Sequence, residues 1–295
     1  MIRLRKKFIN PIRFKKLNNY TLLLPLYNDW DSFKILIHKI NDNLKKNNKK
    51  AEIFIINDFS KKIEVIESLS NIKKIEIINL KKNFGSQKAL SIGLQHLKKL
   101  EDERVIVVMD SDGEDDPDKI SDMLNAAESN TNNVIVSCRT KRRESSTFRV
   151  LYFFHKLITF IFTLEWISYG NYSSFHSKNL AKILKDDSSW LALSTCIKKN
   201  CNILRLYAAR NKRLFGNSKL SIRSLIIHSL RINCVFLKRI IIISFIYSFI
   251  FSYLVNVALV VPIVIYNLIL ILIFLGNNQK EFRNALINVK SKSIF

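Results

Sequence analysis

Short apolar runs alternate with helical patterns along residues 20–140. Five runs have the length and β-branched composition of buried strands, at residues 21–26, 52–56, 75–79, 105–109 and 133–137. Three segments between them have the periodicity of amphipathic helices, at residues 30–44, 87–100 and 118–129. Near-continuous apolar strands that alternate with helices are typical of a mainly parallel sheet covered on both faces. The pattern therefore predicts an α/β fold.

Polar residues follow every predicted strand. They occupy residues 25–29, 57–60, 81–86, 110–118 and 139–143. In parallel α/β sheets, ligands bind outside the carboxyl ends of the strands, so these segments are the candidate site. Neither G-x-G-x-x-G nor G-x-x-x-x-G-K-[ST] occurs in the sequence, which argues against a dinucleotide oxidoreductase and a P-loop ATPase.

A long uncharged run, residues 240–275, follows this region. As one helix its 36 residues would extend about 54 Å, well beyond a hydrocarbon core of about 30 Å. Basic residues lie on both sides: Arg231, Lys238, Arg239, Lys280, Arg283, Lys290 and Lys292. Positive flanks on one side of a membrane require an even number of crossings. We therefore expect a transmembrane hairpin that turns near residues 256–262, with one long tilted span or an interfacial segment as the alternatives.

Two further segments have a membrane-surface pattern. Residues 221–239 alternate basic and apolar positions at helical spacing, which predicts an amphipathic juxtamembrane helix. Residues 148–167 are a second candidate, with a buried core helix as the alternative. The first 20 residues lack the apolar core of a signal peptide, so we expect the bulk of the chain in the cytosol, tethered from its C-terminus.

Composition and charge narrow the function classes. The 295 residues include 48 Lys+Arg and 24 Asp+Glu, for a net charge of +24, and 48% hydrophobic residues exclude intrinsic disorder. Residues 1–19 form a basic arm without an acidic residue, which suits nucleic acid or an anionic membrane. The apolar C-terminal run favours the membrane, and we expect no nucleic-acid partner. Four cysteines without a C-x-x-C pair indicate neither a disulfide scaffold nor a four-cysteine zinc site.

The sharpest chemical signal is an acidic segment after the fourth predicted strand. Six of the 24 acidic residues lie within residues 110–118. Such density destabilises the chain unless a cation is present. Carboxylates in an Asp-x-Asp pattern suit Mg²⁺ or Mn²⁺, which in turn hold nucleotide phosphates. An acidic helix N-terminus is the alternative for Asp115, Asp116 and Asp118, but it does not account for Asp110 or Asp112.

The ordered motifs LLPLYND, NDFS, LKKNFGSQKALSIGL, VVMDSDGEDDPDKI and GNSK resemble those of family-2 glycosyltransferases. Their nearest branch is that of the polyprenyl-phosphate sugar synthases, of the dolichol-phosphate mannose synthase type. The resemblance covers residues 20–220 and implies a GT-A fold, a nucleoside-diphosphate sugar donor and inversion at the anomeric carbon. One motif departs from the family, because Asn57-Asp58-Phe59-Ser60 replaces the usual Asp-Asp-Gly-Ser. The missing glycine places a side chain on a turn that often has positive φ.

The resemblance also implies roles for individual residues. It places the nucleotide sugar against Pro25, Tyr27, Asp29, Asp58 and Asp110. The metal ligands would be Asp110, Asp112 and Glu114. The catalytic residues would be Asp112, Asp115, Arg139 and Lys219, and the acceptor phosphate would lie near Arg139. The basic character of Arg142, Arg149 and Arg213 makes them further candidates for the acceptor phosphate.

The expected function is a membrane-anchored, metal-dependent, inverting glycosyltransferase that transfers a sugar to a polyprenyl phosphate on the cytosolic face of the membrane. Transfer to a hydroxyl of a lipid-linked or cell-surface glycan is the alternative; it would need a base such as Asp115 or Asp116. A non-catalytic membrane scaffold for a partner transferase is the rival from another class. A homo-oligomer is compatible with the sequence.

The expected organisation has five parts. They are a basic arm at 1–19, a GT-A domain at 20–220, an amphipathic helix at 221–239, a transmembrane hairpin at 240–275 and a basic cytosolic tail at 276–295.

Overall fold

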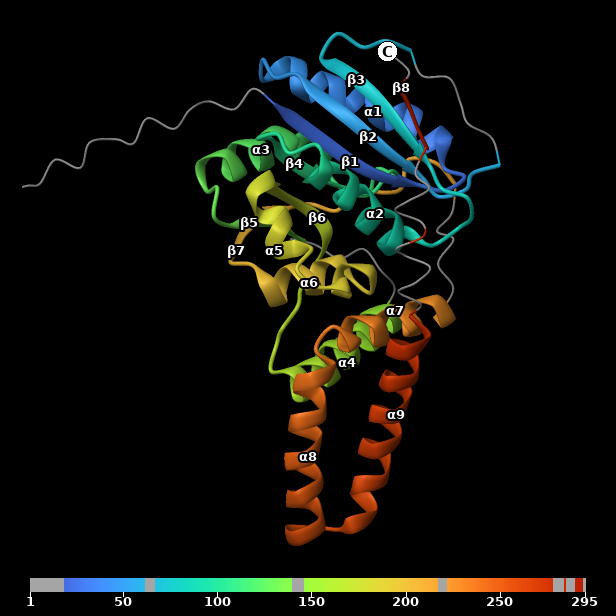
Figure 1. Cartoon of the computed structure of the whole chain (residues 1–295), viewed down its shortest axis with the longest axis vertical. Coiled ribbons are helices and arrows are strands. Elements are labelled where there is room, and N and C mark those ends of the chain that lie inside the picture. The colour runs from blue at the N-terminus through green and yellow to red at the C-terminus, as the bar shows by residue number, and fades with distance from the viewer. Residues whose placement is uncertain are drawn as a thin grey trace, which may run out of the picture.

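The computed structural model describes residues 19–61, 67–139, 146–216, 222–277, 284 and 290–293. Within these residues the chain forms one twisted sheet of eight strands in the order β7-β5-β6-β4-β1-β2-β3-β8 (Figure 1). The strands are β1 Tyr20–Leu26, β2 Ala51–Asn57, β3 Ile72–Asn79, β4 Val105–Val108, β5 Val134–Arg139, β6 Tyr169–His176, β7 Ile203–Ala208 and β8 Lys290–Ser293. Strands β1 to β4 pair in parallel, as do β5 and β7. The mainly parallel α/β sheet predicted from the sequence is confirmed.

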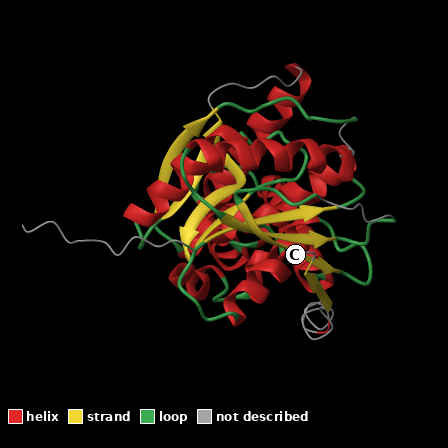
Figure 2. Cartoon of the chain, turned by 90° about the horizontal axis from the view of Figure 1, so that it is seen from above, coloured by secondary structure: helices red, strands yellow, loops and turns green. Residues whose placement is uncertain are grey.

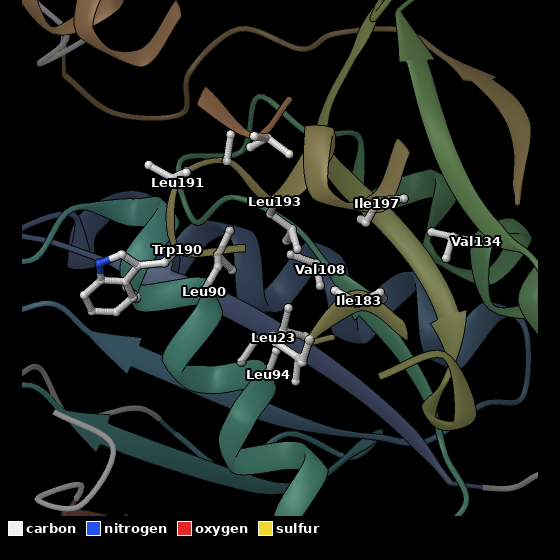
Figure 3. Packing of buried hydrophobic residues seen from close by; sticks show 14 of the residues in the cluster. Leu23, Leu90, Leu94, Val108, Val134, Ile183, Trp190, Leu191, Leu193 and Ile197 are labelled. Atoms are coloured by element: carbon white, nitrogen blue, oxygen red, sulfur yellow. The ribbon is translucent and has the colours of Figure 1, made fainter. Parts of the chain in front are cut away.

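Helices cover both faces of this sheet (Figure 2). On one face lie α1 (Trp30–Lys46) and α3 (Ile120–Ser129), and on the other lie α2 (Ser86–Lys99), α5 (Leu180–Ile183) and α6 (Leu193–Asn200). The strands alternate their side chains between two cores, since Leu22 and Leu24 pack with α1 whereas Leu23 packs with α2. The α2 core is shown in Figure 3, where Leu23, Leu90 and Val108 lie together.

Strand β6 corrects one sequence expectation. From its polar and aromatic residues, segment 170–175 is expected to line an acceptor groove or to form an edge strand. The segment instead forms an interior strand, antiparallel to both β4 and β5. Its Ser173 and Ser174 are fully buried. The polar sequence of this strand therefore gives no sign of its position in the middle of the sheet. This strand places Asn171 and Tyr172 beside the end of β4.

The C-terminal part consists of α7 (Ile222–Cys234), α8 (Leu237–Leu254), the 3-10 turn Val257–Leu259 and α9 (Val260–Gly276). Figure 1 shows α8 and α9 side by side and pointing away from the sheet, with α4 (Ser146–Thr163) and α7 between them and the sheet. The predicted helix at 221–239 is broken after Cys234, and α8 begins three residues before the predicted start of the hairpin.

Helices α8 and α9 are long and apolar enough to cross a membrane. They turn where the hairpin was expected to turn, and most of their large apolar side chains are exposed. The hairpin is also attached to the rest of the chain. Tyr247 Oη donates to the Ile161 carbonyl at 3.0 Å, and the Arg239 guanidinium donates to Glu165 at 3.1 Å.

Candidate active site

The acidic segment forms a tight loop at the carboxyl end of β4. The Asp110 amide donates to Asp115 Oδ2 at 2.9 Å, and the Glu114 amide donates to Asp112 Oδ1 at 3.0 Å. Gly113 lies between them with φ +80°, a conformation that a side chain would disfavour. The side-chain carboxylates thus stabilise the conformation of their own loop. Asp115, which was predicted to be catalytic, fixes the backbone of Asp110.

A second segment crosses this acidic loop. We call residues 209–216, which follow β7, the basic strap. The Asn211 amide donates to the Glu114 carbonyl at 2.9 Å, and the Leu214 amide donates to the Asp112 carbonyl at 3.0 Å. The Leu214 side chain lies directly against Gly113, where a Cβ atom would come within 2.4 Å of Leu214 Cδ1. The strap can therefore pack this closely on the loop only because residue 113 is glycine.

Two arginines of the basic strap neutralise the loop. Arg213 donates from Nη1 to Asp112 Oδ2 at 3.0 Å and from Nη2 to Asp29 Oδ2. Arg210 forms an ion pair with Glu114. The sequence assigned Arg213 to the acceptor phosphate, whereas in this structure it links the carboxylates that follow β1 and β4. Arg210 was not singled out from the sequence, because its partner Glu114 lies 96 residues earlier in the chain.

The pKa of Asp112 is raised to about 6, first by burial and then by the charge of Asp110, with a smaller increase from the charge of Glu114. The Glu114 amide and Arg213 act in the opposite direction. The acidic loop thus carries more negative charge than the arginines of the strap neutralise. This excess favours binding of a cation.

The acidic loop offers carboxylate oxygens to a divalent metal. Within the described ranges, no three His, Cys, Asp or Glu side chains gather as a metal-binding group. Of the predicted ligands, Glu114 pairs with Arg210 and Asp112 with Arg213, so a metal bound by the pair Asp110 and Asp112 would have to displace Arg213. Mg²⁺ is often held by one or two carboxylates together with substrate phosphates and water, so this pair fits the metal.

The loops after β1 and β2 lie side by side next to the acidic loop. The Asn28 amide donates to Ser60 Oγ at 2.9 Å, and the Lys61 amide donates to Asn28 Oδ1 at 2.9 Å. Phe59 has φ +69° and an exposed side chain, so the turn keeps the positive φ expected there even without glycine. Pro25 is buried at the end of β1, whereas Tyr27 is exposed.

Asp58 holds the loop that leads into α2. Its two carboxylate oxygens accept from the amides of Phe84 at 2.7 Å and Gly85 at 2.8 Å, and its side chain is buried. Burial raises the pKa of Asp58, and the two amides lower it. Asp58, which was predicted to contact the nucleotide, thus also fixes the backbone of the loop just before α2.

The remaining predicted residues are only partly described. Arg139 ends β5 and Arg149 lies on α4, but their side chains fall outside the description. Arg142 and Lys219 lie outside the described residues altogether. The structure adds Gln87, which the sequence did not indicate, and it brings Tyr172 of segment 170–175 against the acidic loop. Tyr172 Oη donates to the Asp116 carbonyl at 3.0 Å, and Gln87 Nε2 donates to Asn171 Oδ1 at 3.1 Å.

Comparison with known proteins gives consistent matches. The family model described as "Glycosyl transferase family 2" matches residues 21–189. The uncharacterized glycosyltransferase YkcC of Bacillus subtilis is 29% identical over 137 residues, or 44% of this chain and 40% of that protein. The undecaprenyl-phosphate 4-deoxy-4-formamido-L-arabinose transferase of Proteus mirabilis is 24% identical over 140 residues, or 46% of this chain and 41% of that protein. Only about two fifths of the length of these relatives is matched.

Among solved structures, that of TarS from S. aureus in complex with UDP-GlcNAc matches 80% of this chain and 73% of its own. The sequence identity is 14% and the TM-score is 0.44.

Proposed function

Because the chain belongs to glycosyl transferase family 2, we propose that it transfers a sugar from a nucleoside-diphosphate sugar to the phosphate of a polyprenyl lipid, with inversion. The observation that carries this proposal is the combination of Asp110 and Asp112 at the end of β4 with the apolar pair α8 and α9 in one chain. The name of the Proteus relative supports a lipid phosphate as the acceptor.

The donor would lie across the ends of β1, β2 and β4. Pro25, Tyr27 and Asp29 would contact its nucleoside, and Asp58 would keep the neighbouring loop in place. Asp110 and Asp112 would hold Mg²⁺ or Mn²⁺, which when bound neutralises charge on the leaving diphosphate. Arg213 would then leave Asp112 and turn to the diphosphate, where a guanidinium can bind two oxygens at once.

The acceptor reaction needs no strong base. A lipid phosphate is already anionic, so its oxygen can attack the anomeric carbon while the bond from that carbon to the diphosphate oxygen breaks. We assign the acceptor phosphate to Arg139, Arg142 and Arg149, and closure of the site to Lys219. In this reaction Asp115 acts as a positioning residue through its hydrogen bond to the Asp110 amide.

The membrane arrangement is part of the proposal. Helices α8 and α9 would form a hairpin within 240–275 that crosses the membrane twice, and α7 within 221–239 would lie at the headgroups. Residues 20–220 would form the cytosolic catalytic domain, between the basic arm 1–19 and the tail 276–295. Helix α4 supports this placement, because it lies between the sheet and the hairpin (Figure 1) and exposes Val150, Phe153 and Phe154 at helical spacing.

The test uses the full chain purified in detergent. UDP-, GDP- and dTDP-sugars are supplied with Mn²⁺ or Mg²⁺, with and without polyprenyl phosphate. We expect metal-dependent transfer to the lipid, its loss in Asp112→Asn with the fold retained by circular dichroism, and normal transfer in the control Asp42→Asn, an exposed position on α1. Transfer only to glycan hydroxyls would show that the acceptor is a hydroxyl and not a lipid phosphate. The absence of nucleotide-sugar binding would support the scaffold alternative.

A further inference from the structure

A pair of side-chain amides joins helix α2 to strand β6 at the carboxyl end of the parallel strands. Gln87 lies in the first turn of α2, where it is buried, and Asn171 lies near the beginning of β6, where it is half-buried. Gln87 Nε2 donates to Asn171 Oδ1 at 3.1 Å. The two residues are 84 positions apart in the chain, so only the fold brings them together.

The hydrogen bonds of Gln87 fix the orientation of the Asn171 carboxamide. The Leu193 amide at the beginning of α6 donates to Gln87 Oε1 at 2.8 Å. A backbone amide can only donate, so the oxygen of Gln87 faces Leu193 and its NH₂ group faces Asn171. Asn171 therefore turns its own oxygen toward Gln87. Its Nδ2 group, which carries two N–H donors, is directed away from Gln87.

The strand register places Asn171 beside Asp110. Strands β4 and β6 are antiparallel, and the last pair of their ladder is Val108 with Ser173. Asp110 and Asn171 each lie two residues beyond this pair, at the same end of the sheet. Residues two apart in a strand point to the same face, and Val108 belongs to the core on the α2 face. Asn171 is thus the neighbour of a carboxylate that the proposed function assigns to the metal.

The strand order indicates which part of the donor reaches Asn171. Three neighbouring strands follow the order β6-β4-β1. The proposed function places the nucleoside at the end of β1 and the diphosphate at the end of β4. A ligand that continues in the same direction brings its sugar to the end of β6. A sugar hydroxyl both accepts and donates, so it can accept from Asn171 Nδ2 and donate to a carboxylate such as that of Asp110.

We propose that Asn171 binds a hydroxyl group of the donor sugar and that Gln87 positions its carboxamide for this contact. This inference rests on the proposed function, which it extends with a residue that selects the sugar. Asn171 would touch the substrate, whereas Gln87 would act through Asn171. The expectation that segment 170–175 lines an acceptor groove gives the competing assignment, in which Asn171 contacts the acceptor.

The experiment compares binding of a nucleotide sugar with binding of its nucleoside diphosphate. The full chain in detergent is titrated with UDP-glucose, UDP-N-acetylglucosamine and GDP-mannose, and with UDP and GDP, in the presence of Mn²⁺. Asn171→Ala should weaken the nucleotide sugar that binds best about tenfold, as for loss of one hydrogen bond, and leave its nucleoside diphosphate unchanged. The control is Asn132→Ala, at an exposed position just before β5, at the opposite end of the strands.

Gln87→Glu tests the orientation of the Asn171 carboxamide. Glutamate still accepts from the Leu193 amide, but its second oxygen also accepts, so the Asn171 carboxamide turns over and presents its oxygen to the sugar. The affinity of the nucleotide sugar relative to its diphosphate should fall as far as in Asn171→Ala, and the two losses should not add in the double variant. The added charge repels both ligands, and the free diphosphate more strongly, so it does not lower this ratio. Gln95→Glu on the same helix is the control.

Three results would overturn the proposal. An unchanged affinity ratio in Asn171→Ala would show that the sugar does not contact this residue. Equal weakening of the nucleotide sugar and the diphosphate would indicate a distorted site. A higher KM for polyprenyl phosphate with an unchanged ratio would assign Asn171 to the acceptor. If the wild type binds a nucleotide sugar but transfers it only to hydroxyls, the proposed lipid acceptor fails and the sugar contact stands. If the wild type binds no nucleotide sugar, both fail.

Discussion

Arg213 and Asp112 are 101 residues apart in the chain and are joined by a hydrogen bond of 3.0 Å from Nη1 to Oδ2. The same guanidinium pairs with Asp29, so one side chain connects the ends of β1 and β4. It thereby places a positive charge next to a carboxylate that the proposed metal needs. Metal binding and the Arg213 ion pair are therefore expected to compete.

Replacement of Arg213 with Gln tests this competition. Since both partners are largely buried, the loss of the ion pairs leaves two carboxylates without their donor and should lower the free energy of unfolding by about 1–3 kcal/mol without metal. The affinity for Mn²⁺ should rise severalfold, because Asp112 is no longer engaged. Thermal unfolding and Mn²⁺ titration by electron paramagnetic resonance measure the two effects, with Arg205→Gln on the exposed side of β7 as the control. Unchanged or weaker Mn²⁺ binding in Arg213→Gln would contradict the competition.

The contact between Gly113 and Leu214 gives a second prediction. Gly113→Ala should destabilise the protein by about 1–3 kcal/mol beyond the backbone penalty of positive φ, because its Cβ would overlap Leu214. Gly216→Ala is the control, since Gly216 also has positive φ but meets nothing within 4 Å. In a double-mutant cycle measured by denaturant unfolding, Leu214→Ala should remove the extra cost. Additive effects would show that the strap does not pack on the loop.

The sequence predicted the first five strands because each contains a short, largely apolar run. It also placed Asp110 and Asp112 correctly after the fourth strand. It missed β6 as an interior strand because Ser173 and Ser174 break the apolar pattern, although both are buried. A buried serine and an exposed one look alike in a sequence.

The basic strap shows the other limit of the sequence. Arg210 and Arg213 follow a short strand without a periodic pattern, and their partners lie about 100 residues earlier. Local propensity contains no information about such a distant pair. The resemblance to the family drew attention to Arg213, but its ion pairs with Asp29 and Asp112 became visible only when the strands were placed in order.

A pH dependence is expected where α4 meets α7. Burial and the neighbouring charges of His228 and Lys156 lower the pKa of His155 to about 4, and Ser229 Oγ contacts its Nδ1. Burial and Arg231 likewise lower the pKa of His228. The unfolded chain therefore takes up protons first as the pH falls below about 6.5, which favours unfolding.

His155 should thus reduce stability by about 1–3 kcal/mol between about pH 6.5 and pH 4. The variant His155→Gln should lose this part of the pH dependence, because glutamine does not titrate and can still bond to Ser229. Thermal midpoints measured across this range in detergent test the prediction. His38→Gln, at an exposed position on α1, should follow the wild type. The same slope in His155→Gln and the wild type would exclude a contribution from His155.

The end of α4 allows the membrane placement to be tested with intrinsic fluorescence. The chain contains 3 tryptophans, of which Trp30 is 5% exposed and Trp190 is fully buried, whereas Trp166 is 40% exposed. Trp166 lies beside Phe160, with its ring 4.6 Å from Lys156 Nζ, an arrangement typical of a membrane interface. Residues 240–275 contain no tryptophan, so the proposed hairpin adds no signal of its own.

In vesicles containing brominated lipid, we expect strong quenching of wild-type fluorescence and little quenching of Trp166→Phe. Aqueous iodide should quench Trp166 less in vesicles, where the lipid covers its ring, than in the chain unfolded by denaturant without detergent. Trp30→Phe is the control and should keep the lipid-dependent quenching. Quenching by iodide without quenching by brominated lipid would place this end of α4 in water, and α4 would then not lie on the membrane even if α8 and α9 cross it.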